Sequence, residues 1–129
     1  MGGFTFTEVV VIEAIRGQLS QGDNLSIAEP FVPVRYPDGL YYMAEGPYLP
    51  MEKGQFYLVY LGVAPHNPDL DDHWVILGGF QGKFRVPSKP IPALEAITAR
   101  DVGLNYMVRD WVDNVWFKVA EKYFKDLDN

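Results

Sequence analysis

Alternating apolar and polar positions fill the first two-thirds of the chain, and this pattern predicts a series of β-strands. The first run is rich in β-branched residues at positions 9–12, which favour strands. Turns that contain glycine or proline separate the runs, and Gly78-Gly79 predicts a bulge or tight bend between the last two. The runs expected to be strands are residues 4–16, 25–29, 34–36, 40–43, 55–62, 73–77 and 82–86.

A hairpin is expected around Pro37-Asp38-Gly39, because proline presets φ and glycine accepts the positive φ of such turns. This turn would join residues 34–36 to residues 40–43. Pro30 and Pro33 interrupt the segment before it, and proline cannot donate a hydrogen bond to a sheet. That segment is therefore expected to be an edge strand or an excursion from the sheet.

Near residue 101 the spacing of apolar residues changes to three and four, which predicts an amphipathic helix to about residue 126. Asp101 or Asn105 is expected to cap this helix, and residues 91–100 are expected to add a short helical turn. Two interpretations of the wide apolar stripe stay open. It belongs to a buried core helix, or part of it meets a partner or a second copy of the chain, as in a homodimer formed through the C-terminal helix. The stripe comprises Leu104, Val108, Trp111, Val112, Val115, Trp116, Phe117, Val119, Ala120, Tyr123 and Phe124.

The strands and their glycine turns predict a fold that is mainly β, a small closed antiparallel barrel formed by residues 1–90. The C-terminal amphipathic α-helix in residues 91–129 is expected to pack on the barrel, so that residues 1–129 form a single domain. A chain of 129 residues buries roughly two-thirds of its unfolded surface, which is enough for one core without disulfides or metals.

Composition narrows the classes of partner. The formal net charge is −6, from 17 acidic and 11 basic residues. A negative domain repels phosphate backbones and anionic membranes, so we expect no nucleic-acid partner. The chain has no cysteine, which excludes disulfides, thiolate zinc sites and cysteine nucleophiles. It also has no run of 18 apolar residues, so no transmembrane segment is expected.

The junctions between strands and turns within residues 8–86 follow a recognisable order. They are Ile15-Arg-Gly17, Gly22-Asp23, Leu49-Pro-Met-Glu-Lys-Gly54, Gln55-Phe-Tyr-Leu-Val-Tyr-Leu61 and Gly79-Phe-Gln-Gly-Lys-Phe84. This order resembles that of small exported proteins and lipoproteins of Gram-positive bacteria, and it is similar to netrin-like, OB-type barrels. The resemblance implies an OB or netrin-like barrel and an extracellular or cell-envelope location, with a cytoplasmic location as the alternative.

The resemblance implies no activity. Netrin-like metalloproteinase inhibitors use an N-terminal cysteine to chelate a catalytic zinc, and this chain has none. Arg16 also stands where the pattern more often has lysine. The resemblance therefore supplies no catalytic residue and no cofactor.

Aromatic side chains are the most numerous candidates for a contact surface, at 15% of the chain. OB folds stack bases or sugars on such residues, although packing in the core is the simpler interpretation. The residues expected to bind a ligand are Tyr41, Tyr48 and Trp74. The wider set that would form the platform is Tyr36, Tyr41, Tyr42, Tyr48, Tyr57, Tyr60, Trp74 and Phe80.

The loop over residues 64–73 carries the local cluster of possible metal ligands, His66, Asp69, Asp71, Asp72 and His73. Its spacing matches no EF-hand, so we expect a solvated loop and no dedicated metal site, with weak, adventitious binding of a cation such as Ca²⁺ as the alternative. Its histidines and aspartates also give the chain its one candidate for acid–base chemistry. No other catalytic motif occurs, and no catalytic residue or cofactor is predicted.

Lys83 and Arg85, with Lys89 nearby, alternate along a predicted strand and are expected to share one face. That face would either meet an acidic partner or lie in solvent. The sequence as a whole predicts an exported, non-enzymatic binding or interaction module whose partner is a protein or a small ligand. The alternatives are a small hydrolase-type enzyme that uses the His/Asp loop at 66–73 and an OB-type single-strand nucleic-acid binder.

Overall fold

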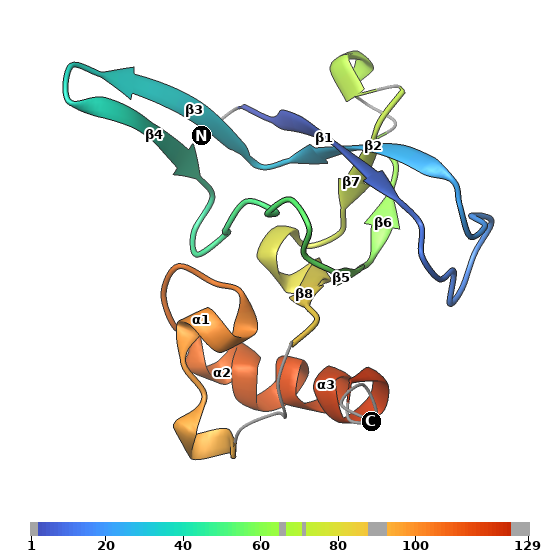
Figure 1. Cartoon of the computed structure of the whole chain (residues 1–129), viewed down its shortest axis with the longest axis vertical. Helices are drawn as coiled ribbons and strands as arrows, with labels where there is room; N and C mark the ends of the chain where they lie inside the picture. Colours follow the sequence, from blue (N-terminus) through green and yellow to red (C-terminus); the bar gives the residue numbers. More distant parts are fainter. Residues whose placement is uncertain (1–2, 65–66, 71, 88–92, 125–129) are drawn as a thin grey trace.

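The computed structural model describes residues 3–64, 67–70, 72–87 and 93–124. Strands make up the first part of the chain and short helices the last part (Figure 1). The C-terminal helices α1, α2 and α3 lie together on one side of the molecule, beyond strand β8, and the four-stranded sheet and the β3-β4 hairpin lie on the other side (Figure 1). The predictions of mainly strands followed by a helical C-terminal segment are confirmed at this level.

The largest sheet has four strands in the order β1-β2-β7-β6. They are β1 (Thr5–Val10), β2 (Asn24–Glu29), β6 (Leu61–Gly62) and β7 (Trp74–Ile76). β1 pairs with β2 and β6 pairs with β7 in antiparallel fashion, whereas β2 and β7 run parallel. The strand predicted over residues 4–16 is shorter than expected: β1 begins at Thr5 and ends at Val10.

The predicted hairpin is confirmed and is longer than the sequence indicated. β3 (Phe31–Tyr36) and β4 (Gly39–Ala44) pair along their full length across a turn at Pro37 and Asp38. They form a separate two-stranded sheet that extends away from the rest of the molecule (Figure 1). We call residues 31–44 the arm. The prolines preceding the turn therefore do mark an excursion, as the sequence predicted.

The run over residues 55–62 divides into two strands at Tyr60. β5 (Tyr57–Val59) pairs with β8 (Lys83–Arg85), whereas β6 pairs with β7. The Tyr60 amide donates to Gly82 O at 2.9 Å, and its carbonyl accepts from the Leu77 amide at 2.8 Å. Between β7 and β8 lies the 3₁₀ turn η2 (Gly79–Gly82), which confirms the predicted bend. Only glycine fits at 82, because a Cβ there would lie 1.9 Å from Leu77 O.

The described residues form three open sheets and no closed barrel. Closure would need the strands to continue as one hydrogen-bonded ring. β1 stops at Val10, and the arm diverges after Pro30 to pair only within itself. The barrel expected over residues 1–90 is therefore corrected to open sheets.

The predicted long helix is broken. Its first part is replaced by two short elements: η3 (Leu94–Ala96) is a single 3₁₀ turn, and α1 (Ala99–Val102) is one helical turn. A further 3₁₀ turn, η1 (Pro68–Leu70), lies among the strands, between β6 and β7. The helix that follows is continuous from residue 109 and comprises α2 (Arg109–Trp111), the π-helical turn η4 (Val112–Trp116) and α3 (Phe117–Tyr123).

The prediction that one helix begins near residue 101 was wrong. Gly103 adopts a left-handed conformation with φ of 77° and ends α1, so the longer helix begins only at Arg109. The cap was also assigned to the wrong residue. Thr98 caps α1, and Asp101 completes a capping box with it.

Two apolar clusters form the core. One lies between β8 and the helices and contains Trp111, Val112 and Trp116. The other lies under the four-stranded sheet and contains Leu25, Ile27, Tyr48 and Ile76. Phe80 contacts both clusters. Most of the apolar stripe of the C-terminal helix is therefore buried or partly buried within the chain, as the interpretation of a buried core helix predicted.

Candidate functional site

The arm exposes large apolar side chains. In β4, Leu40 is 63% exposed, Tyr41 49%, Tyr42 40% and Met43 51%. Alternation along the strand places Leu40 and Tyr42 on one face of the hairpin and Tyr41 and Met43 on the other. Soluble domains rarely leave contiguous apolar residues uncovered on both faces of a sheet. The arm therefore lies outside the core, with large apolar side chains open to solvent on both of its faces.

Aromatic contacts between its strands stiffen the arm. The rings of Tyr36 and Tyr41 meet edge to face at 5.7 Å, and those of Phe31 and Tyr42 meet in the same way at 6.1 Å. Each contact is a diagonal cross-strand pair, and such pairs stabilise hairpins. The Tyr41 hydroxyl also donates to Asp38 Oδ2 at 2.9 Å. These contacts hold the exposed rings in a defined geometry.

The base of the arm is fixed by the buried carboxylate of Glu29, which is 1% exposed. Glu29 Oε1 accepts from the Tyr48 hydroxyl at 2.5 Å and from the Met51 amide at 2.8 Å. Glu29 Oε2 accepts from the Thr7 hydroxyl at 2.5 Å. Glu29 lies two residues before the start of the arm, and residues 48–51 follow four to seven residues after its end. The three hydrogen bonds therefore tie the two ends of the arm to each other and to β1.

Lys83 enters the same region from β8 and is 4% exposed. Its ammonium donates to the Leu49 carbonyl. It also lies 4.1 Å from the ring centroid of Tyr48 and 5.2 Å from that of Tyr57, positions suited to cation–π attraction. We call Thr7, Glu29, Tyr48 and Lys83 the buried polar cluster. A buried charge is tolerated here because it has a carbonyl, two ring faces and a nearby carboxylate.

Burial sets the protonation behaviour of this cluster. Removal from water lowers the pKa of Lys83 to about 8, against an opposing effect of Glu29 that favours the ammonium. Burial also raises the pKa of Tyr48, and the charge of Glu29 and its hydrogen bond raise it further. The phenol therefore stays protonated and keeps donating to the carboxylate.

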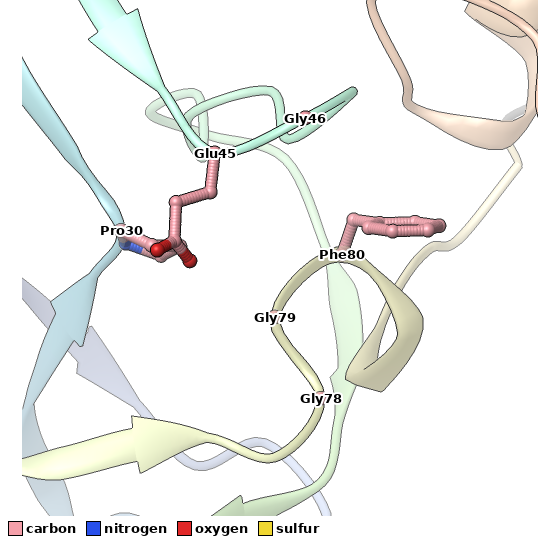
Figure 2. A pocket seen from close by; sticks show the side chains of 6 residues that line it. All are labelled: Pro30, Glu45, Gly46, Gly78, Gly79 and Phe80. Carbon is pink, nitrogen blue, oxygen red and sulfur yellow. The ribbon is translucent and has the colours of Figure 1, made fainter. Parts of the chain in front are cut away.

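A small groove lies beside the base of the arm, with a volume of about 230 Å³. Pro30, Glu45 and Gly46 line one side, and Gly78, Gly79 and Phe80 line the other (Figure 2). The Phe80 ring points away from Glu45 (Figure 2). Glu45 is the sole titratable residue of this lining, so the groove offers no acid–base pair.

The three residues predicted to bind a ligand do not form one surface. Tyr41 is exposed on the arm, Tyr48 is fully buried in the polar cluster, and Trp74 is partly buried against the core under the four-stranded sheet. The broader aromatic platform is likewise divided between arm and core. Of the three residues predicted to bind a ligand, Tyr41 alone is exposed on the arm.

The His/Asp loop is placed only in part. His66 and Asp71 lie outside the described residues, and Asp69 and Asp72 are exposed. His73 is partly buried: its Nδ1 lies 2.7 Å from Ser26 Oγ, and its ring stacks on Phe6 at 3.9 Å. Within the described residues, no three acidic, histidine or cysteine side chains gather in a way that could hold a metal ion.

The basic strand face expected at Lys83 and Arg85 is corrected. Lys83 is buried, so it can neither meet an acidic partner nor lie in solvent, and Lys89 lies outside the described residues. The buried polar cluster was missed by the sequence reasoning. The signal was the alternation of Leu25, Ile27 and Glu29, which places Glu29 on the core face of β2.

Comparison with known proteins adds no relative, since no protein family, curated protein or solved structure matches this chain. In the part of the chain that the structure describes, no helix is both long and apolar enough to cross a membrane.

Proposed function

We propose that this protein is a non-enzymatic interaction module that contacts a partner protein through the arm. The observation that carries this proposal is the exposure of Leu40, Tyr41, Tyr42 and Met43 on a hairpin with no third strand among the described residues. An isolated two-stranded hairpin is marginally stable in water, and a further partner strengthens it. Rigid aromatic residues also supply contact area at low entropic cost.

The buried polar cluster supports this function by positioning the arm. Glu29 fixes one end of the arm and Tyr48 the other, so the arm leaves the body in a set direction. A contact surface whose direction is fixed in advance loses less entropy on binding. The cluster therefore acts through the arm and does not itself touch a partner.

The proposal extends to location and ancestry. The resemblance of residues 8–86 to exported proteins of Gram-positive bacteria supports a location outside the cell or in the cell envelope. Its similarity to netrin-like, OB-type proteins supports a shared origin of the sheets, with the arm as an elaboration. A homodimer through the C-terminal helix has less support, because Trp111, Val112 and Trp116 are buried within the chain.

Photo-crosslinking tests the arm as a contact surface. A benzophenone amino acid would replace Tyr42 on the arm, or exposed Glu121 on α3 as the matched control. We expect discrete adducts in an extract of the source cells from position 42 and none from position 121. Adding Leu40→Lys to the same arm should abolish them. Equal adducts at both positions, or adducts insensitive to Leu40→Lys, would overturn the proposal.

One observation favours an enzyme as the second candidate. Ser26 Oγ and His73 Nδ1 lie 2.7 Å apart, within the reach of a nucleophile and its general base. Neither residue lines the groove at the base of the arm. An ester such as p-nitrophenyl acetate provides the test: hydrolysis that is lost in both Ser26→Ala and His73→Ala, with folding intact, would establish this candidate over the binding module.

A further inference from the structure

The outer edge of β4, a six-residue strand, differs from the unpaired edges of the other two six-residue edge strands, β3 and β1. β4 (Gly39–Ala44) contains no charged residue and no proline. β3 carries Pro33 and Arg35, and β1 carries Glu8. Proline and charge are the devices by which edge strands avoid pairing with other chains. β4 lacks both devices, and within the described residues nothing pairs with its outer edge.

The register of the arm shows which backbone groups face outward. In antiparallel pairs, successive residues alternate between positions whose N–H and C=O face the partner strand and positions whose groups face away. The Glu45 amide donates to Pro30 O at 3.2 Å, which fixes the phase of this alternation. Leu40, Tyr42 and Ala44 consequently point their backbone groups away from β3.

The same alternation of inward and outward backbone groups explains why β3 can contain a proline at position 33. Pro33 lies opposite Tyr42, at a position where the backbone nitrogen faces away from β4. The missing N–H therefore costs the hairpin nothing, but it removes a donor from the outer edge of β3. Pairing with another chain is blocked on β3 and open on β4.

We propose that β4 pairs with β4 of a second copy of this chain in antiparallel fashion, around a two-fold axis at Tyr42. This inference rests on the proposed function, since it names the second copy as one partner of the arm. The two hairpins would form a four-stranded sheet in the order β3-β4-β4-β3. An isologous contact of this kind is automatically matched in length and hydrogen-bond pattern.

This register also suits the side chains. Leu40 falls opposite Ala44 of the second copy, a large residue against a small one. Tyr41 falls opposite Met43 of the second copy, which brings a thioether to an aromatic ring. Glu45 falls opposite Gly39 of the second copy, so no like charges face each other despite the net charge of −6.

The area available predicts a reversible dimer rather than a permanent one. An aromatic side chain buries about 150–250 Å², so each half-exposed residue from 40 to 43 offers roughly 100 Å². Two arms together would bury at most about 800 Å² of side chain, below the size of a stable interface. We expect association that rises with concentration between about 10 μM and about 1 mM.

Sedimentation equilibrium of the full chain tests this inference. Wild type and Tyr42→Phe should shift from the mass of one chain to that of two over that concentration range. Tyr42→Pro removes the outward N–H at the axis and leaves the bonds to β3 intact, so it should stay at the mass of one chain. A wild type that remains a single chain throughout, or a Tyr42→Pro variant that associates equally well, would overturn the inference.

A second variant keeps the test decisive if Tyr42→Pro fails to fold. Tyr42→Cys introduces the only thiol of the chain, and a paired residue at the axis brings its Cα within disulfide range of its counterpart. Mild oxidation should link two chains through Tyr42→Cys and not through Tyr36→Cys near the tip of the arm. Equal linkage of both variants, or none at position 42, would contradict the two-fold axis.

These outcomes separate the inference from the broader function. Crosslinked adducts from position 42 with a mass other than two chains support an interaction module that binds a different protein. A single-chain mass in sedimentation would then overturn self-pairing alone. If position 42 gives no crosslinked adducts and the chain also stays single in sedimentation, the contact role of the arm is overturned.

Discussion

The arm and the C-terminal helical layer are both rich in large apolar residues, yet they place them in opposite environments. Trp111, Val112 and Trp116 are buried in the helical layer. Tyr41 and Met43 of the arm are about half exposed. The helices pack against Phe84 of β8 and against Phe80, whereas the arm has one ladder and two open faces. The same residue types therefore stabilise the fold in one region and are available for contact in the other.

The largest difference between the two regions is expected in the loss of stability that an alanine substitution causes in each. Trp116→Ala removes a fully buried ring, which should lower the free energy of unfolding by about 3–5 kcal/mol. Tyr42→Ala in the arm should lower it by less than about 1 kcal/mol at dilute concentration, because the ring is partly in water. Urea denaturation measures both. Similar losses at the two positions would mean that the arm belongs to the cooperative core.

The buried polar cluster predicts a pH dependence of stability. The pKa of Lys83 is about 8 in the folded chain, against 10.5 for an ordinary lysine. Between these values the unfolded state holds a proton that the folded state does not. Stability should therefore rise with pH from about 8, by at most about 1.4 kcal/mol per unit.

Tyr48 sets the upper limit of this rise. Its pKa is raised above the ordinary value of 10.0, so above that pH the unfolded phenol ionises while the folded one does not. Stability should fall again there. Thermal unfolding between pH 7 and 11 measures the curve, and Lys83→Met is the control that should remove the rise. A wild-type curve that is flat or falls from pH 8 to 10 would contradict the buried ammonium.

Removing one donor from the Glu29 carboxylate should have the next largest effect. Tyr48→Phe deletes the hydrogen bond to Glu29 Oε1, and a bond to a charged group contributes about 1.5–3 kcal/mol. Tyr57→Phe is the matched control, because the Tyr57 hydroxyl only accepts from the exposed amide of Glu52. Equal losses of unfolding free energy in the two variants would argue against a special role for the cluster.

The smallest expected effect is that of charge on the arm. Leu40 is 63% exposed, so Leu40→Lys should change the unfolding free energy by no more than about 0.5 kcal/mol. It should nevertheless weaken association, since a charge on an edge strand opposes pairing. Denaturation and sedimentation on one sample separate the two effects, and a large loss of stability would show that Leu40 belongs to the core.

Local patterns predicted the local elements of this fold. The Pro37-Asp38-Gly39 turn predicted the hairpin, the two glycines at 78–79 predicted the bend, and the change of period predicted helices at the end. What the sequence did not predict is how the strands associate. The run over residues 55–62 reads as one strand, and its division at Tyr60 depends on which partner each half meets in three dimensions.

The candidate site was harder to predict for a related reason. Tyr41 and Tyr48 look alike in the sequence, but one lies in the arm and the other donates to a buried carboxylate. Lys83 was placed in solvent because charged residues usually are, and its burial depends on a carbonyl 34 residues away. Pairings over such distances leave no trace in local periodicity.

The most direct test of the arm as a contact surface is hydrogen exchange at single amides of β4 as a function of protein concentration. The Tyr42 amide faces away from β3, whereas the Tyr41 and Met43 amides face it and serve as internal controls. Protection of Tyr42 should be low at dilute concentration and should rise as the chain is concentrated. Protection of Tyr42 that does not change with concentration would contradict self-pairing of the arm.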